Sequence, residues 1–413
     1  MILKKNKTTN LYKKKASSII DIDMKVILWI IKINNIEDNS NNPIFKYPLN
    51  WERILLKARN HGVILLLYKK LKNLKQQVAP SEIMASLESF YSNNAIRNLR
   101  MGQKLIRLIN ILSTEKIDAI AFKGACLSIR AYKDLSMRTF CDLDIYIRKE
   151  DFVRVYDLLE LYGYKSHFPQ IKKIKKLWKR TGRDFLFLDK SISYDFHQRI
   201  TQGSKQFQIT EDIWGNTSFT TINSCKVKVL SSEYTVLALC IHGAKHNWLH
   251  LKFITDIAFF ISSNRDLNWS LIISKAKNIG CLNITLAGIL LSNEFCGLPL
   301  PYMINKEINK NKRVKKLTNK IKNRILRGKT NSGRLSEFLC IPRTMDSIFD
   351  GLRYIFYYIF TPSQFDLLVI NLPEFLYPFY YIIRPIRQFY KYFTKFLDLL
   401  FNKFKKSKSE SQS

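Results

Sequence analysis

Two aspartates, Asp142 and Asp144, lie two residues apart in a short segment that has the pattern of a β-strand. Leu143, Ile145 and Ile147 alternate with them, and this period of two is typical of a strand with one buried face. Both carboxylates should therefore project from the same side, roughly 6.5 to 7 Å apart along the backbone. Two anions at this spacing repel each other, so neutralising one should stabilise the chain slightly. Hard oxygen ligands in this arrangement suit Mg²⁺, whose coordination shell substrate phosphates would complete. The alternative interpretation is that the two carboxylates lie on a solvated strand face and bind no metal.

The residues before this pair predict a strand at 117–122 that turns directly into a helix at 124–132. Lys123 and Gly124 form the turn. A glycine here lets backbone N–H groups approach an anion, and a helix N-terminus favours phosphate. The turn is therefore a candidate phosphate site, unless the glycine serves only the tight turn.

A third carboxylate follows on another predicted strand. The pattern predicts a helix at 148–162 with Gly163 as its C-cap, then strands at 185–188 and 192–197. Ser193, Asp195 and His197 share one face of the second strand. Asp195 should thus be displayed beside the aspartate pair.

This order of parts resembles the nucleotidyltransferase superfamily that includes DNA polymerase beta. It is most similar to a bacterial family of uncharacterised nucleotidyltransferases. The residues that carry the resemblance are Phe122-Lys123-Gly124-Ala125, Tyr132, Arg138, Asp142-Leu143-Asp144-Ile145, Gly163-Tyr164, Asp195-Phe196-His197-Gln198-Arg199, His242-Gly243-Ala244-Lys245-His246-Asn247-Trp248, Leu251-Lys252, Asp256-Ile257-Ala258 and parts of 51–67 and 380–385. Lys123-Gly124 stands where the superfamily usually has Gly-Ser.

The resemblance implies an α+β fold, in which a small mixed β-sheet nucleotidyltransferase core with flanking helices is followed by an α-helical domain. It implies Mg²⁺-dependent transfer of a nucleoside monophosphate from a nucleoside triphosphate to a hydroxyl acceptor, with release of pyrophosphate. The acceptor could be a sugar, a protein, a small molecule or an RNA. The resemblance assigns catalysis and the binding of two Mg²⁺ ions to Asp142, Asp144 and Asp195, and nucleotide binding to Lys123, Gly124, Arg138, Lys245 and His246.

The charge of the chain indicates an anionic partner. Its 413 residues include 68 Lys and Arg against 33 Asp and Glu, a formal net charge of +35. Nucleotide, nucleic acid or an anionic membrane surface would fit such a balance. The alternative is a coding bias that enriches lysine, asparagine and isoleucine without any function. Basic helices predicted at 171–180 and 306–329 are either anion-binding faces or solvated ones.

The pattern along the chain divides it into five parts. These are a basic disordered tail (1–18), a helical region (19–112), the nucleotidyltransferase core (113–230), a helical domain (231–345) and an aromatic and basic C-terminal segment (346–413). Helices are predicted at 24–33, 51–71 and 81–112, and a capped helix starts at Ser231. A histidine-rich helical stretch covers 242–256, where Lys252 and Asp256 are spaced as an i,i+4 pair.

Seven cysteines without a Cys-x-x-Cys pair predict reduced thiols in the cytoplasm. No secretory signal and no membrane-spanning stretch is predicted. The C-terminal segment has two interpretations. Its aromatic and basic stripe either lies in an anionic membrane interface, at the inner face of the membrane, or packs on the helical domain.

Two other functions remain open from the sequence. One is a catalytically degenerate protein that binds nucleotide or acts as a scaffold, which the altered Lys123-Gly124 motif favours. The other is a basic peripheral protein that binds membrane or nucleic acid.

Overall fold

The computed structural model describes residues 20–33, 42–166, 184–189, 192–199, 211–328, 340–370, 372–390 and 394. The predicted tail at 1–18 and the predicted basic helix at 171–180 lie outside these residues.

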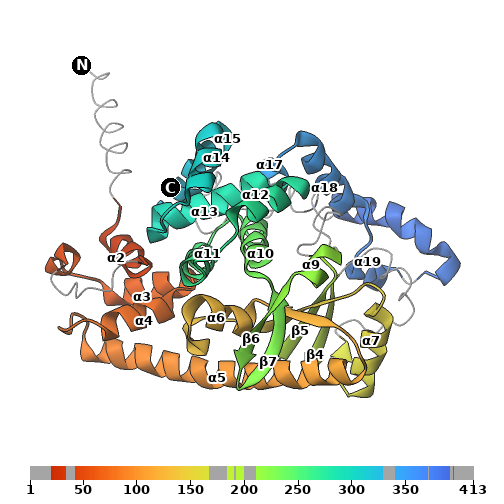
Figure 1. Cartoon of the computed structure of the whole chain (residues 1–413), viewed down its shortest axis with the longest axis horizontal. Helices are drawn as coiled ribbons and strands as arrows, with labels where there is room; N and C mark the ends of the chain where they lie inside the picture. The colour runs from red at the N-terminus through yellow and green to blue at the C-terminus, as the bar shows by residue number, and fades with distance from the viewer. Residues whose placement is uncertain are drawn as a thin grey trace, which may run out of the picture.

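A mixed sheet forms the centre of the fold (Figure 1). In the described chain it has seven strands in the order β3-β4-β5-β2-β1-β7-β6. The strands are β1 (Ala119–Phe122), β2 (Asp142–Ile147), β3 (Lys165–Ser166), β4 (Phe185–Asp189), β5 (Ile192–His197), β6 (Thr217–Ile222) and β7 (Cys225–Leu230). The central β2 is antiparallel to β1 and parallel to β5.

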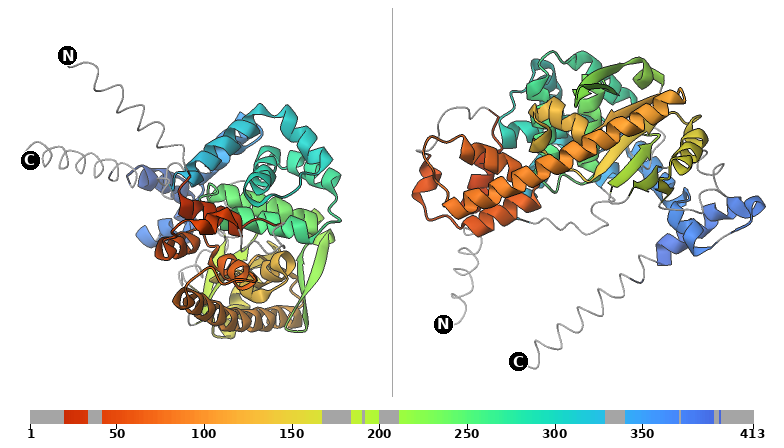
Figure 2. Two further views of the ribbon diagram at one scale, coloured as in Figure 1. Left: turned by 90° about the vertical axis from the view of Figure 1, so that its left-hand side faces the viewer. Right: turned by 90° about the horizontal axis from the view of Figure 1, so that it is seen from below.

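The two faces of the sheet pack against different sets of helices. The alternation predicted for β2 is confirmed, because Leu143, Ile145 and Ile147 are buried in one core with residues of α5 (Ser81–Thr114) and α7 (Phe152–Leu161). Figures 1 and 2 show the long helix α5 running along this side of the sheet. The opposite face carries Tyr146 and joins a second core with the helices described next. The central strands β1, β2 and β7 thus contribute side chains to both cores.

The second core consists mainly of helices before and after the sheet. After the sheet come α10 (Ser232–Lys245), α11 (Lys252–Ser263), α12 (Trp269–Asn278), α13 (Leu282–Cys296), α14 (Tyr302–Lys310) and α15 (Lys312–Leu326). Before it come α2 (Ile22–Ile30), η1 (Pro43–Lys46), α3 (Trp51–Asn60) and α4 (Ile64–Lys72). Helix α10 begins as predicted, because the Ser231 hydroxyl accepts a hydrogen bond from the Tyr234 amide at 3.4 Å.

Shorter elements complete the fold. Helix α6 (Gly124–Tyr132) and the 3₁₀ turn η2 (Leu135–Met137) connect β1 to β2, and α9 (Glu211–Gly215) precedes β6. The C-terminal part contains α17 (Cys340–Thr344), α18 (Ile348–Phe360), α19 (Gln364–Val369), η5 (Glu374–Phe379) and a helical stretch at 380–390. Among the residues described, none of the helices combines the length and hydropathy needed to cross a bilayer.

The predicted α+β fold class is confirmed, with a mixed sheet, flanking helices and a helical part after it. Three predicted helices are each broken in two. The stretch 306–329 divides into α14 and α15 at Asn311. The stretch 51–71 divides into α3 and α4 at Gly62, whose φ of +70° ends the first helix. The stretch 242–256 divides into α10 and α11, because Asn247 and Trp248 adopt positive φ angles of 55° and 44°.

Candidate active site

The three predicted carboxylates lie on one face of two adjacent parallel strands. In the pairing of β2 with β5, Asp144 is opposite Asp195 and Asp142 is opposite Ser193. Asp144 is buried, whereas Asp142 and Asp195 are partly exposed. The Ser193 hydroxyl donates a hydrogen bond to Asp195 Oδ1 at 2.9 Å and so fixes this carboxylate. The structure therefore brings together the three residues that strand parity predicted.

Asp144 is the centre of a charged network. Its Oδ1 lies 2.7 Å from Lys123 Nζ and accepts a hydrogen bond of 3.0 Å from His197 Nε2. The other ring nitrogen of His197, Nδ1, lies 3.1 Å from Asp184 Oδ2. His197 thus lies between two carboxylates, and its ring also packs edge-on against Phe122, with the centroids 5.6 Å apart.

The pKa values follow from these contacts. Burial alone would raise the pKa of Asp144, but Lys123 and His197 hold it well below its usual range. Burial alone would lower the pKa of His197, but Asp184 and Asp144 raise it to about 9. His197 is therefore protonated at neutral pH. Burial raises the pKa of Asp195, and repulsion from Asp144 adds to this effect, so this carboxylate holds a proton more readily than a free aspartate.

The turn between β1 and α6 is strained. Lys123 has φ 51° and ψ −150°, a conformation that residues with a side chain seldom adopt, and Gly124 follows at φ +45°. The Lys123 amine is held by Asp144 and lies 4.4 Å from the centre of the Phe122 ring. These contacts stabilise the turn at the N-terminus of α6, where the resemblance places a phosphate.

Arg138 makes a contact that the sequence did not predict. Its Nε lies 3.1 Å from both carboxylate oxygens of Asp256 on α11, and the Tyr132 hydroxyl donates to Asp256 Oδ1 at 2.8 Å. Asp256 is buried, so these two partners compensate its charge. The predicted i,i+4 partner of Lys252 is therefore engaged with Arg138 instead.

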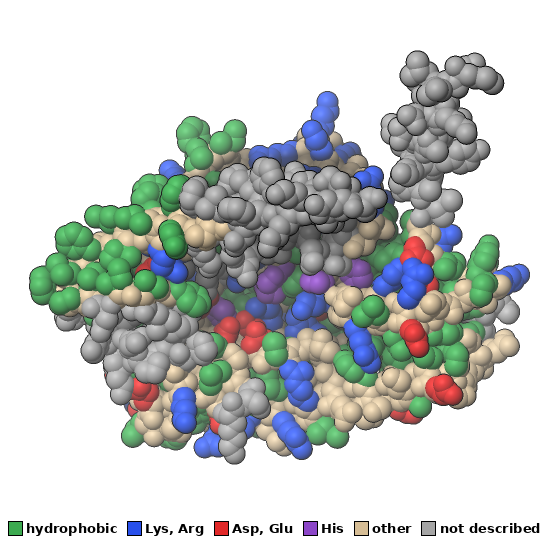
Figure 3. Space-filling view, turned by 180° about the vertical axis from the view of Figure 1, so that it is seen from behind, with side chains coloured by type: hydrophobic (Ala, Val, Ile, Leu, Met, Phe, Trp, Pro, Cys, Tyr) green, Lys and Arg blue, Asp and Glu red, His purple; other side chains and the backbone are tan. Residues whose placement is uncertain are grey.

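The end of α10 faces the carboxylates from the helical side. Desolvation lowers the pKa of Lys245, and the carboxylates of Asp184 and Asp144 act in the opposite direction, so its amine lies within electrostatic reach of them. His246 stacks on Phe253 at 4.8 Å between ring centroids, and burial lowers the pKa of His246 to about 3. Figure 3 shows acidic, basic and histidine side chains gathered in a hollow on the face opposite to the view of Figure 1.

The predicted residues thus fall into two groups. Asp142, Asp144, Asp195, Lys123, Gly124 and Lys245 belong to one charged cluster. Arg138 is tethered to α11 by Asp256, although the Asp144 carboxylate also acts to raise the pKa of Arg138, and His246 packs on an aromatic ring. Sequence reasoning missed Asp184 and the network role of His197. The alternation of side chains along β5 places His197 on the same face as Asp195, so the sequence could have indicated its role. Asp184 immediately precedes β4, and no periodic pattern includes it.

The chemistry of this cluster fits Mg²⁺. The available donors are carboxylate oxygens, and burial together with repulsion from Asp144 and Asp142 raises the pKa of Asp195. In the part of the chain that the structure describes, no three metal-binding side chains converge at ligating spacing. Mg²⁺ is usually held by one or two carboxylates together with substrate phosphates, so it does not need a cage made by the protein alone.

Two solved structures align with the chain: the antibiotic-resistance factor ANT(2'')-Ia and the lincosamide antibiotic adenylyltransferase LnuA in its lincomycin-bound form. ANT(2'')-Ia is 10% identical, with a TM-score of 0.31, over 43% of this chain and 90% of its own. LnuA is 15% identical, with a TM-score of 0.25, over 44% of this chain and 96% of its own.

No curated protein sequence matches the chain. A family described as "Uncharacterised nucleotidyltransferase" matches it over residues 47–297, which is more than half of its length and includes every residue of the charged cluster. The chain belongs to this nucleotidyltransferase family.

Proposed function

We propose that the chain transfers a nucleoside monophosphate from a nucleoside triphosphate to a hydroxyl acceptor and releases pyrophosphate. The observation that carries the proposal is the position of three carboxylates on one face of β2 and β5, next to the Lys123-Gly124 turn at the start of α6. Membership of the nucleotidyltransferase family supports the reaction class. The acceptor class stays open among sugars, proteins, small molecules and RNA.

In this proposal Asp142, Asp144 and Asp195 hold two Mg²⁺ ions. When bound, the ions stabilise the negative charge that develops on the attacking and leaving oxygens. Lys123, Lys245 and the backbone at Gly124 bind the triphosphate, since two cations and a helix N-terminus lie around the carboxylates.

Asp195 also takes the proton of the acceptor hydroxyl. The acceptor oxygen forms a bond to the α-phosphorus, the bond to pyrophosphate breaks, and the proton moves to the Asp195 carboxylate. Its partial exposure and its hydrogen bond from Ser193 leave it oriented and reachable. A positioned general base contributes about 10² to 10⁴-fold in rate.

One observation favours a second candidate, a nucleotide-binding protein without catalysis. Asp144 Oδ1 is shared by Lys123 and His197, two cations that compete with a metal for this oxygen. If these contacts persist with nucleotide bound, the site binds triphosphate but does not transfer it.

Thermal unfolding with each of the four nucleoside triphosphates tests nucleotide binding. We expect at least one to raise the unfolding temperature in Mg²⁺ and to have little effect in EDTA. Pyrophosphate release with that nucleotide, with a filtered cell extract as the source of acceptor, then separates the two candidates.

Asp195→Ala should lower the rate of pyrophosphate release by about 10² to 10⁴-fold, far more than it weakens nucleotide binding, because Asp142 and Asp144 keep their carboxylates. Asp118→Asn is the matched control, because Asp118 pairs with Lys228 at 2.6 Å outside the cluster. Binding without release in the wild type would establish the non-catalytic candidate, and full release by Asp195→Ala would remove Asp195 from catalysis.

A further inference from the structure

The C-terminal residues 348–390 expose an unusual amount of apolar surface. They hold fourteen of the twenty-three exposed large hydrophobic side chains in the described chain. The most exposed of them are Phe375 (78%), Phe349 (74%), Ile348 (72%) and Phe389 (71%). Figure 3 shows hydrophobic side chains gathered at one end of the molecule, over this segment. Soluble monomers seldom expose a large contiguous apolar patch, and such patches usually mark a binding surface.

Part of the interior of the same segment is polar. Asp366 is fully buried and Arg384 is 2% exposed, although Ile382 and Ile386 on either side of Arg384 are 57% and 64% exposed. Ser363 is also buried. Arginine and aspartate are almost never fully buried unless they are paired, so their burial here needs a specific arrangement.

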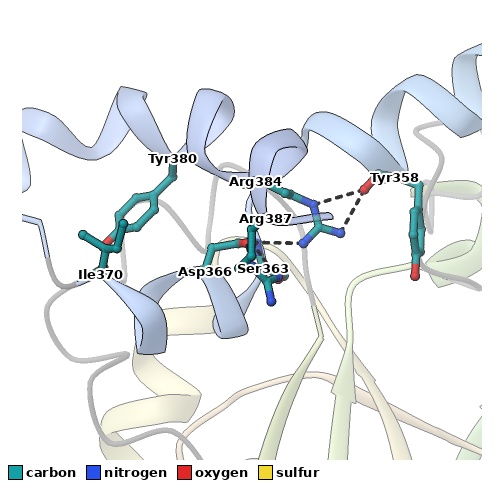
Figure 4. Close-up of polar contacts among 7 residues, drawn as sticks. All are labelled: Tyr358, Ser363, Asp366, Ile370, Tyr380, Arg384 and Arg387. Carbon is teal, nitrogen blue, oxygen red and sulfur yellow. Dashed lines mark hydrogen bonds and ion pairs between the residues drawn. The ribbon is translucent and has the colours of Figure 1, made fainter. Parts of the chain in front are cut away.

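Figure 4 shows how the polar interior holds the segment together. Arg384 Nη1 donates to Asp366 Oδ2 at 3.0 Å, and its Nε and Nη2 donate to the backbone oxygen of Tyr358 at 3.1 and 2.9 Å. Asp366 Oδ2 also accepts from the Ser363 hydroxyl at 2.7 Å, and Arg387 Nε donates to Oδ1 at 2.5 Å. Three elements, α18, α19 and the helical stretch 380–390, are therefore fixed by polar side chains.

Around Asp366 this arrangement reverses the usual one, in which apolar side chains pack inside and charged ones face water, although Tyr354, Tyr377 and Tyr380 of the same segment are buried. The polar contacts that hold the segment together are internal. The apolar side chains on its outside are therefore available to contact another apolar medium. They come from α18, α19, η5 and residues 380–390, so they form a broad surface.

The charge of the chain indicates which medium this is. After residue 390 the sequence contains six lysines and two acidic residues, interspersed with phenylalanine and leucine. Segments that mix aromatic and aliphatic side chains with basic ones lie in the interface of bilayers, and lysines are attracted to anionic lipids. The whole chain carries a formal charge of +35, which adds to this attraction.

We propose that residues 348–390 bind an anionic membrane surface, with their exposed phenylalanine and isoleucine side chains entering the boundary between headgroups and acyl chains. The proposal is independent of nucleotide transfer. The segment is also fixed to the sheet, since Tyr377 and Tyr380 are buried in the core with β2 and β5. Arg199, just after β5, lies 5.0 Å from the centre of the Tyr357 ring. A chain bound to lipid in this way holds its charged cluster at a fixed position relative to the membrane.

Vesicle flotation with the full-length protein tests the proposal. We expect the protein to float with vesicles of phosphatidylcholine mixed with phosphatidylglycerol, and less with phosphatidylcholine alone. Phe349→Gln, Leu352→Gln, Phe375→Gln and Ile386→Gln, combined in one variant, should lower the partition coefficient more than about tenfold, because four exposed apolar side chains are lost.

The matched control changes four equally exposed apolar residues elsewhere, Leu56→Gln, Leu161→Gln, Phe219→Gln and Tyr302→Gln, and should float like the wild type. A second variant, Arg353→Gln, should weaken the preference for anionic vesicles, whether or not the first variant folds, because the Arg353 side chain is 76% exposed within the same segment. Equal flotation of the wild type and both variants would overturn the proposal. So would a wild type that fails to float and instead self-associates through this surface, with the first variant monomeric by light scattering.

Discussion

Two cationic side chains, Lys123 and His197, contact the same carboxylate oxygen of Asp144. The sequence alone predicts that neutralising either aspartate of the pair relieves repulsion and stabilises the chain. The structure changes that expectation for Asp144, because the nearest charges around it are opposite in sign. Asp142 lies on the same strand but is partly exposed, so it serves as the comparison for Asp144.

We therefore expect Asp144→Asn to lower the free energy of unfolding by about 3–5 kcal/mol, since the Lys123 amine loses its carboxylate partner and His197 keeps only Asp184. Asp142→Asn is the control and should change stability by less than about 1 kcal/mol. Urea unfolding of the two variants measures the difference. Equal stability of both would show that the network around Asp144 does not hold the fold.

The pKa of His197 predicts how stability depends on pH. This pKa is raised from 6.5 to about 9 in the folded protein. A raised pKa contributes stability that is fully present below about pH 6.5 and is lost as the pH rises through about 9. The shift corresponds to about 3 kcal/mol. Between pH 6.5 and 9, the free energy of unfolding of the wild type should therefore fall by about 3 kcal/mol more than that of His197→Gln. Urea unfolding across this pH range measures the difference, and parallel profiles for the two proteins would contradict the assignment.

Part of the site could be predicted from single residues and part could not. Asp142, Asp144 and Asp195 followed from the parity of two strands, and β2 and β5 pair as that parity requires. Asp184 and the pairing of Arg138 with Asp256 depend on contacts between residues distant in sequence. No local pattern contains such contacts.

At the scale of elements, periodicity located most helices and strands but not their breaks. The strands at β4 and β5 and the long helix α5 lie where the sequence predicted them. The break after α10 depends on Trp248, which is fully buried and has a positive φ. Hydrophobic spacing does not reveal such a turn, because tertiary burial compensates its backbone strain.

Gly243 makes room for Trp248, and this gives a test of the turn. A Cβ at residue 243 would overlap the Trp248 indole, so Gly243→Ala should lower the free energy of unfolding by about 1–3 kcal/mol. Gly215→Ala is the control, because a Cβ there meets no atom within 4 Å. Chemical denaturation of both variants checks the expectation, and an unchanged midpoint for Gly243→Ala would mean that the indole moves at little cost.

At the scale of the whole molecule, Arg138 joins the segment before β2 to α11. The side chains of Arg138 and Asp256 are 13% and 3% exposed, so the pair is buried between the sheet and the helical part. The resemblance assigned Arg138 to the nucleotide, whereas its contacts in the structure are with Asp256.

Arg138→Gln should accordingly cost about 3–5 kcal/mol of stability, because it leaves Asp256 buried without a cation. Arg154→Gln, which removes a surface pair with Asp151, should cost less than about 1 kcal/mol. Thermal and urea unfolding compare the two. If Arg138→Gln is as stable as Arg154→Gln and loses only nucleotide affinity, Arg138 is a nucleotide ligand rather than a link between the two parts.

The central claim is that the carboxylates of β2 and β5 bind a nucleoside triphosphate through Mg²⁺, and calorimetric titration tests it most directly. The titration uses the nucleoside triphosphate that gives the largest thermal shift, with wild type, Asp142→Asn and the Asp118→Asn control. We expect Asp142→Asn to weaken binding in Mg²⁺ by more than about tenfold, equivalent to about 1.4 kcal/mol, and Asp118→Asn to bind like the wild type. Equal affinity of Asp142→Asn and the wild type would contradict the claim.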